Sequence, residues 1–491
     1  MRQYLVGSLV IGIGACLAGC PLKYIDVCDD GACDALDASG DSPADVVADV
    51  AGCDRTKELK DSPKCIDDAV GLFVSPTGLD TNAGTKASPL ATLGKALALG
   101  GRERIYVCEG TYAGSVDVTK TVAIYGGLKC DWTPTGAHAV IQADKSAYAV
   151  QVTASNVSFV DIDVLAKGGA AAGESSIGLF ANAATSLKLL RVKVSAGAGV
   201  TGTNGSTGSN YTTVSQGDAS IKGKDASGIA GGGPKVCALC TDAKSSVGGG
   251  GGNGGAAPSD GSAGTPVLGG GAKGLADPDG VGVMTCTTGG LGTSPTAATP
   301  APSPTTSGTL DGTGWKPSSG TAGVNGAPAQ GGGGGGGGFD GSNAFGGGGG
   351  GGCGGCGGGL GTGGTGGGSS IALLSFSSTI TLTASELVST TAGNGGNGAA
   401  GQAGQLGGFN GTAASQGCAG GNGGTGGAGG SGSGGSGGLS VGILYKGTKP
   451  TTDAATDGKI TFGTKGNKGV GGTPTVNDGV DGVAQAVLQI P

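Results

Sequence analysis

Three short stretches of the chain repeat one pattern, and they decide the fold that the sequence predicts. They read SSIG at residues 175–178, SSIA at residues 369–372 and LSVG at residues 439–442. Each begins a strand, turns, continues into a second strand and ends in a tract rich in Gly and Asn; residues 148–173 follow the same plan without the opening serines. Because a unit of this size cannot bury an apolar face alone, its copies have to stack.

Short strands separated by turns precede the second copy of this pattern. Their apolar residues alternate, which is typical of half-buried strands, and they lie at residues 105–107, 115–118, 122–126, 139–143, 148–152, 157–164, 176–181 and 187–195. A helical pattern occurs only near Ser88, a good N-cap residue, which is followed by Pro89 at the first helical position. Leu90, Leu93 and Leu97 would share one face of this helix. We therefore predict a short helix that covers the open end of the stacked strands.

The same part of the chain carries a family resemblance. From Phe73 it reads FVSPTGLDTNAGTKASPLATLGKAL, followed by RIYVCEGTY and VAIYGG. These motifs resemble the opening of right-handed parallel β-helix proteins, which include pectate-lyase-like enzymes and many bacterial surface proteins. The resemblance covers about residues 71–196. It implies an all-β fold, a right-handed parallel β-helix (solenoid) with a short N-terminal capping helix and long Gly-rich insertions, and leaves the activity open.

The Gly-rich tracts separate the repeats and set the domain boundaries. In residues 331–368, 27 of 38 residues are Gly. Such a tract has too few side chains for their burial to offset the conformational entropy lost when the backbone becomes ordered. Such tracts are either disordered or packed as extended polyglycine-like strands on the solenoid flank, and the sequence leaves both open. The expected parts are a signal peptide at 1–19, an acidic linker containing Cys at 20–70, cap and first coils at 71–196, an insertion at 197–368, a coil at 369–392, an insertion at 393–438 and final coils at 439–491.

The N-terminus reads as an export signal. An apolar run from Tyr4 to Ala18 follows the positive charge of Arg2, and it is too short to span a bilayer. Residues 17–20, LAGC, resemble the lipobox of a bacterial lipoprotein. That resemblance implies cleavage before Cys20 and lipid on Cys20, with the membrane as a partner through this anchor. In many of the bacterial lipoproteins that this motif resembles, Asp directly after the lipidated Cys retains the protein at the inner membrane. Residue 21 is Pro, so we expect this protein at the bacterial outer membrane or cell surface. The alternative is an ordinary cleaved secretory signal.

Charge and composition exclude several classes of function. Residues 21–70 hold 13 acidic and 5 basic residues, whereas the remainder is nearly neutral and has no basic stripe. A nucleic-acid partner is therefore not expected. The chain has one histidine, His138, which disfavours His-based catalytic triads and His-ligated metal sites. We expect no cofactor and no metal.

The cysteine count agrees with export. Of 14 cysteines, 12 remain after Cys16 leaves with the signal and Cys20 takes lipid, an even number as expected for disulfides. Cys108 and Cys130 are separated by about one coil, and neighbouring strands lie within disulfide range, so we predict that they pair.

Two Cys-x-x-Cys pairs lie in the Gly-rich part, Cys237 with Cys240 and Cys353 with Cys356. A zinc ribbon sets its pairs some 15–20 residues apart, whereas 112 residues intervene here, and no βαβ setting for a redox motif is present. We expect structural disulfides in preference to a metal or redox site, with their connectivity open.

Four charged residues are the candidates for sugar-cleaving chemistry. The resemblance to pectate-lyase-like enzymes implies that Asp161 and Asp163 would bind calcium and that Arg191 or Lys193 would remove a proton. The alternative follows from aligning residues 159–164 with 189–194, which places Asp161 beside Arg191 and Asp163 beside Lys193. We favour this reading: two exposed cross-coil ion pairs, each worth ~0.2–1 kcal/mol.

Together these patterns predict a non-catalytic cell-surface or outer-membrane lipoprotein with a structural, adhesive or envelope-interaction role. Its expected partners are envelope glycans or other surface proteins. The alternative is a calcium-dependent polysaccharide lyase or a carbohydrate-binding protein, and fold alone does not separate these classes.

Overall fold

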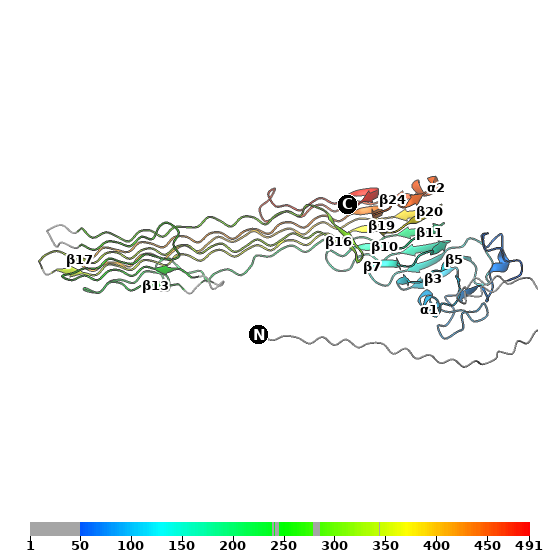
Figure 1. Ribbon diagram of the computed structural model, residues 1–491, viewed down its shortest axis with the longest axis horizontal. Coiled ribbons are helices and arrows are strands. Elements are labelled where there is room, and N and C mark those ends of the chain that lie inside the picture. The colour runs from blue at the N-terminus through cyan, green and yellow to red at the C-terminus, as the bar shows by residue number, and fades with distance from the viewer. Residues whose placement is uncertain (1–49, 238–239, 241–244, 278–284, 343) are drawn as a thin grey trace, which may run out of the picture. The chain divides into compact units, whose positions relative to one another are not determined.

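The structure is a computed structural model that describes residues 50–237, 240, 245–277, 285–342 and 344–491. The described residues belong to one unit, in which the sheets lie at one end and long extended chains run away from them (Figure 1). The predicted signal peptide, the lipid-bearing Cys20 and the linker up to residue 49 lie outside them.

Most regular structure consists of short strands in three parallel sheets. Sheet 1 contains, in spatial order, β1 (Gly71–Val74), β2 (Arg104–Cys108), β5 (Ala123–Leu128), β8 (Ser158–Val160), β11 (Leu187–Leu190), β20 (Ile380–Thr383) and β23 (Thr451–Thr452). Sheet 2 contains β25 (Ala484–Gln489), β22 (Ser440–Lys446), β19 (Ser370–Phe376), β10 (Ser176–Asn182), β7 (Ala147–Val152) and β4 (Val116–Val118). Sheet 3 contains β24 (Ile460–Thr461), β21 (Glu386–Val388), β12 (Lys193–Ser195), β9 (Ile162–Leu165), β6 (Ala139–Gln142) and β3 (Gly110–Ala113).

The three sequence repeats lie side by side in sheet 2. Ser176 pairs with Ser370, which in turn pairs with Ser440, so the opening serines are in register. The apolar residues that follow are therefore stacked as well. Their inward side chains, such as Leu179 and Leu373, join a buried core shared by all three sheets.

The predicted right-handed β-helix solenoid is not what the structure contains. Its strands form three large stacked parallel sheets of seven, six and six strands, without a closed solenoid. The chain leaves the sheets between β12 and β19 and again between β21 and β22. The residues of these two segments are not loops on the surface of the sheets. They form a second ordered body, because their backbones hydrogen-bond to one another.

Sheets 1 and 3 meet at a tight corner that the sequence pattern concealed. The predicted strands 157–164 and 187–195 are each divided in two, at Asp161 (φ 54°) and Arg191 (φ 52°). Ala384 occupies the same corner one strand further along, with φ 48°. Because Ala adopts the same left-handed conformation, the corner is part of the architecture and not a strain peculiar to the charged pair.

The N-terminal helix is present but starts later than predicted. Helix α1 spans Leu93–Leu99, and its N-cap is Thr92, whose side chain accepts a hydrogen bond from Lys95 N at 3.1 Å. The predicted start at Ser88 is wrong because Leu90 is held in an extended conformation beside β1, through hydrogen bonds with Phe73 and Ser75. The helix still buries its apolar face against the core, as expected of a cap. The described chain has one other α-helix, α2 (Ala454–Asp457), and a 3-10 turn at Pro63–Cys65.

The Gly-rich segments within residues 197–368 and 393–438 pack together as what we call the glycine bundle (Figure 1). Residues 331–337 lie at its centre, and successive amides there donate to different neighbouring chains in a cycle of three. This is the pattern of an extended helix with three residues per turn. Six neighbours surround this central chain, at residues 249–252, 259–265, 274–277, 287–290, 349–352 and 418–421.

The period of three continues along the bundle. Every third amide from residue 349 to residue 367 donates to the carbonyl of every third residue from 418 to 436. Glycine is required inside because the chains approach so closely: a Cβ at Gly333 would lie 1.9 Å from the carbonyl oxygen of Ala272. Ordering of this backbone is therefore offset by hydrogen bonds between chains, not by side-chain burial.

Part of the first Gly-rich segment returns to cover sheet 2. The hairpin of β15 (Gly308–Asp311) and β16 (Gly314–Pro317) lies on its outer face, where Trp315 packs with Phe180 and Leu374. The indole Nε1 of Trp315 donates a hydrogen bond to Ser369 Oγ at 2.8 Å. The central strands of sheet 2, β10, β19 and β22, are thus buried on both faces. The two other hairpins, β13 (Lys235–Val236) with β14 (Val247–Gly248) and β17 (Gly338–Phe339) with β18 (Phe345–Gly346), belong to the bundle.

Five disulfides join described residues. Cys108 is bonded to Cys130, with a Cα–Cα distance of 4.9 Å, and this bridge links the end of β2 to the turn after β5. The cysteines of the two Cys-x-x-Cys motifs are not bonded within each motif but across two chains of the bundle. The motif cysteines form the disulfides Cys237–Cys353 and Cys240–Cys356. The other two disulfides are Cys286–Cys418, also in the bundle, and Cys53–Cys65, near the start of the described chain. A spacing of three residues is one turn of the bundle chains, so both cysteines of a motif face the same neighbour.

Candidate functional site

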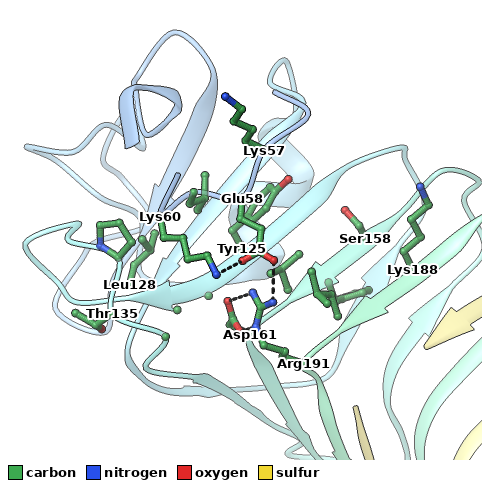
Figure 2. Close-up of a pocket in the computed structure, with 18 of the residues that line it drawn as sticks. Lys57, Glu58, Lys60, Tyr125, Leu128, Thr135, Ser158, Asp161, Lys188 and Arg191 are labelled. Atoms are coloured by element: carbon green, nitrogen blue, oxygen red, sulfur yellow. Dashed lines mark hydrogen bonds and ion pairs between the residues drawn. The ribbon is translucent and has the colours of Figure 1, made fainter. Parts of the chain in front are cut away.

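A cavity of about 650 Å³ lies between residues 55–60 and the outer face of sheet 1 (Figure 2). Strands β1 and β2 of this face are covered by the described residues that precede β1, which we call the N-terminal segment. Its Leu59 and Ile66 pack on Phe73 of β1 and Tyr106 of β2. The cover ends at β5, and the next strands form the cavity floor. Their outward side chains include Tyr125, Val160 and Leu190, which lie on neighbouring strands, and Ser158 beside Lys188.

An ion-pair network crosses the cavity and ties its two walls together. Arg191 Nε donates to Asp161 Oδ1 at 2.5 Å, and its Nη2 donates to Asp161 Oδ2 at 2.9 Å. The third nitrogen, Nη1, donates to Glu58 Oε1 at 3.2 Å, and Lys60 Nζ lies 3.4 Å from Glu58 Oε2. Figure 2 shows Lys60, Glu58, Arg191 and Asp161 in one connected row. Arg191 therefore fastens the N-terminal segment to sheet 1.

Two glycines make room for the acidic end of this network. Gly126 and Gly127 follow Tyr125 in β5, and a Cβ at Gly126 would lie 2.1 Å from the carbonyl oxygen of Asp161. A Cβ at Gly127 would lie 2.8 Å from Asp161 Oδ2, and its φ of +73° also favours glycine. The carboxyl group of Asp161 is consequently well buried, with 8% of the residue exposed.

The two predicted cross-coil ion pairs are thus only half realised. Asp161 pairs with Arg191, but the pair is more buried than predicted. Asp163 lies beside Lys193 in register, yet Lys193 Nζ bonds to Glu386 Oε1 at 2.9 Å on the opposite neighbour. Asp163 Oδ1 instead lies 2.6 Å from Nδ1 of His138. A carboxylate on the next strand, which the two-strand alignment did not include, competes for Lys193.

The charges of this network shift the ionisation of two of its members. Hydrogen bonding to Asp161 raises the pKa of the Arg191 guanidinium above its ordinary value, against the opposing effect of burial. Burial is the largest single influence on Glu58 and would raise its pKa, but the charges of and hydrogen bonds from Arg191 and Lys60 together outweigh it and lower that pKa. Both effects favour the ionised pair. Arg191 is therefore a poor proton acceptor, contrary to what a lyase base requires.

A buried arginine adjoins the cavity without a carboxylate partner. Arg104 is 4% exposed, and among the described residues it forms no ion pair. Its Nη2 donates to the carbonyl oxygen of Arg55 at 3.2 Å, its guanidinium carbon lies 5.1 Å from the centroid of the Tyr125 ring, and its Nη1 has no hydrogen-bond partner. Both contacts, Arg55 and Tyr125, line the cavity.

Cations outnumber acids around the cavity. Its charged lining residues are Arg55, Lys57, Glu58, Lys60, Asp161, Lys188 and Arg191. Both acids in this set are already bound, to Arg191 or to Lys60, and two of the cations, Arg55 and Lys57, pair with Glu103 and Asp54 outside the lining. Lys188 is exposed and forms no ion pair with a described residue. Lys188 is therefore the lining cation left for a ligand in the described part of the chain, and hydroxyl and aromatic groups lie beside it.

Within the parts of the chain that the structure covers, no three His, Cys, Asp or Glu side chains are grouped so as to hold a metal ion. The predicted calcium-binding carboxylates, Asp161 and Asp163, are instead held by Arg191 and approached by His138.

Sequence reasoning found Asp161 and Arg191 but missed the residues that make the site a cavity. Glu58 lies in the acidic linker, 133 positions from Arg191, and no spacing rule connects them. Arg104 and Lys188 are single basic residues within strands. The one available signal was the Gly126–Gly127 pair within β5, because glycines inside a strand indicate close approach of another group.

No family model matches the chain, and neither a curated protein nor a solved structure does. A search of the described helices finds none with the length and apolar character needed to cross a membrane.

Proposed function

We propose that this protein is an exported, lipid-anchored envelope protein with a non-catalytic binding role. The observation that carries the non-catalytic part is the position of Arg191. A lyase needs a basic group that is free to take a proton beside the substrate, whereas Arg191 donates to both Asp161 and Glu58. Two residues that resembled part of a catalytic set, Asp161 and Arg191, instead form ion pairs that join sheet 1 to Glu58 of the N-terminal segment. We call the Arg191–Glu58 pair the clasp.

The glycine bundle supports a structural component of this role. Its chains bond to neighbours in every direction, and three disulfides join them. Such a body suits a spacer or a presenting surface in an oxidising compartment. The anchor at Cys20 remains part of the proposal on the sequence motif alone.

The decisive experiment is an assay for eliminative cleavage. The purified protein is incubated with polygalacturonate and other acidic glycans in the presence of calcium, and ultraviolet absorbance is followed for unsaturated products. We expect no turnover. Turnover that disappears with Asp161→Asn or Arg191→Ala, but persists in the exposed control variant Lys120→Gln, which lies outside the cavity, would establish the polysaccharide lyase instead.

A further inference from the structure

Charged groups in the lining of the cavity and next to that lining favour a negatively charged ligand. A buried guanidinium without a carboxylate partner is costly, since removing a charge from water is compensated only by pairing and hydrogen bonds. Arg104 is in this position, with one nitrogen unpartnered. Its charge is met in part by the face of the Tyr125 ring, 5.1 Å from the guanidinium carbon.

The surrounding charges reinforce this demand. Burial raises the pKa of Tyr106 to about 12, and the positive charge of the neighbouring Arg104 opposes that rise. The acids of the cavity do not balance Arg104, because Asp161 and Glu58 are both bound by Arg191. Lys188 adds a further exposed cation on the cavity floor.

The neutral part of the lining indicates what carries the negative charge. Tyr125 offers an aromatic ring, and Ser158 and Thr135 offer hydroxyls around it. Aromatic rings flanked by hydrogen-bonding groups suit sugar rings, which present apolar faces and polar edges. A cavity of about 650 Å³ falls within the range of small-ligand sites and is open on one side.

We infer that this cavity binds an anionic saccharide, a sugar whose carboxylate or phosphate group is attracted by Lys188 and Arg104. The inference rests on the proposed non-catalytic role and specifies the chemistry of the ligand. Lys188, on the strand next to Ser158, is the direct contact on the floor. Arg104 acts from behind Tyr125 as a fixed positive charge, and the clasp of Arg191 and Glu58 keeps the wall opposite in place.

The test is calorimetric titration of the full chain with three probes: a short oligogalacturonate, a sugar phosphate and a neutral dextran oligomer. We expect one or both charged probes to bind, with an affinity that falls as salt rises, and the neutral probe not to bind. The two charged probes distinguish a carboxylate from a phosphate source.

Variants locate the binding. Lys188→Glu should weaken the charged probe at least about tenfold, because it replaces an attraction by a repulsion, whereas Lys120→Glu, an exposed charge outside the cavity, should leave it unchanged. Arg104→Gln should also weaken binding, and Arg104→Lys should retain most of it. If Arg104→Gln fails to fold, the pair of lysine variants still decides the matter.

Equal binding of charged and neutral probes, or equal effects of Lys188→Glu and Lys120→Glu, would overturn the site. Absence of binding without turnover would remove the site and leave the non-catalytic role intact. Binding at the cavity accompanied by unsaturated products would keep the site and remove the non-catalytic role.

Discussion

Arg191 donates two parallel hydrogen bonds to the carboxylate of Asp161, at 2.5 and 2.9 Å, across two adjacent strands. This bidentate arrangement is the strongest geometry for such a pair, and it lies at a corner where both residues have left-handed backbones. Because Asp161 is also largely buried, the pair differs from the exposed ladder that the sequence predicted.

Replacing this carboxylate should therefore cost more than a surface pair does. We expect Asp161→Asn to lower the free energy of unfolding by about 1–3 kcal/mol, because Arg191 keeps Glu58 but loses its charged partner in a buried place. The matched control is Lys193→Gln, whose ion pair with Glu386 is exposed and worth ~0.2–1 kcal/mol. Denaturant unfolding of both variants measures the difference. Equal losses would show that the burial of Asp161 contributes nothing.

The interior of the glycine bundle should tolerate no side chain. Gly333→Ala places a Cβ 1.9 Å from the backbone oxygen of Ala272, so we expect a loss of about 3 kcal/mol or more in bundle stability. Gly217→Ala is the control, since the nearest atom to its Cβ is 3.9 Å away on Phe409; it should be neutral or stabilise by up to ~1 kcal/mol. Thermal unfolding and amide hydrogen exchange report the outcome. A Gly333→Ala protein with unchanged exchange in residues 331–337 would contradict the close packing.

The disulfides Cys237–Cys353 and Cys240–Cys356 should contribute unequally to the free energy of unfolding, depending on the order in which they are removed. Once Cys237 is bonded to Cys353, the bridge between Cys240 and Cys356 closes only a small ring, so its removal by double Ala substitution should cost ~2–3 kcal/mol on the chain-entropy model. Removing both opens a loop of more than 100 residues and should cost a further ~4–5 kcal/mol. Unfolding is measured without reductant. Non-reducing peptide maps that join Cys237 to Cys240 would refute this connectivity.

Acid should loosen the bundle where Asp225 holds it. A hydrogen bond from the backbone of Thr412, followed by one from Lys222, lowers the pKa of Asp225 from 3.8 to about 2. Because the pKa of Asp225 is lower in the folded than in the unfolded protein, its ionisation stabilises the folded state at pH values above 3.8. This contribution is lost as the pH falls from 3.8 towards 2. Asp225 is half exposed, so we expect less than about 1 kcal/mol. Asp225→Asn should be less stable at neutral pH and should flatten the acid dependence of unfolding in that window; an unchanged slope would exclude the effect.

Lipid should be attached at Cys20. Cells that express the protein and are fed a radioactive fatty acid should yield a labelled protein, because the sequence at 17–20 resembles a lipobox. Cys20→Ala should abolish the label, and Cys16→Ala, within the cleaved segment, should not. Label that persists in Cys20→Ala would place the anchor elsewhere or remove it.

The parts of the fold that the sequence predicted are those carried by local patterns. The opening serines at 176, 370 and 440 are aligned in sheet 2 because each repeat sets its own inward residues. The corner at Asp161 was missed because apolar alternation continues through it. The bundle could not be derived, since glycine has no side chain to mark a face and its partners lie far away in sequence, as in the bond from Gly352 to Gly421. The cavity depends in the same way on Glu58 meeting Arg191 across 133 positions.

The orientation of the bundle chains determines how the bundle carries mechanical load. Its hydrogen bonds run sideways between chains and recur at every third residue from 349 to 367. A pull along the chains therefore strains many of these bonds in shear at once, whereas a sideways pull at one end opens them one after another. A protein of this construction resists traction along the chain axis far better than traction across it.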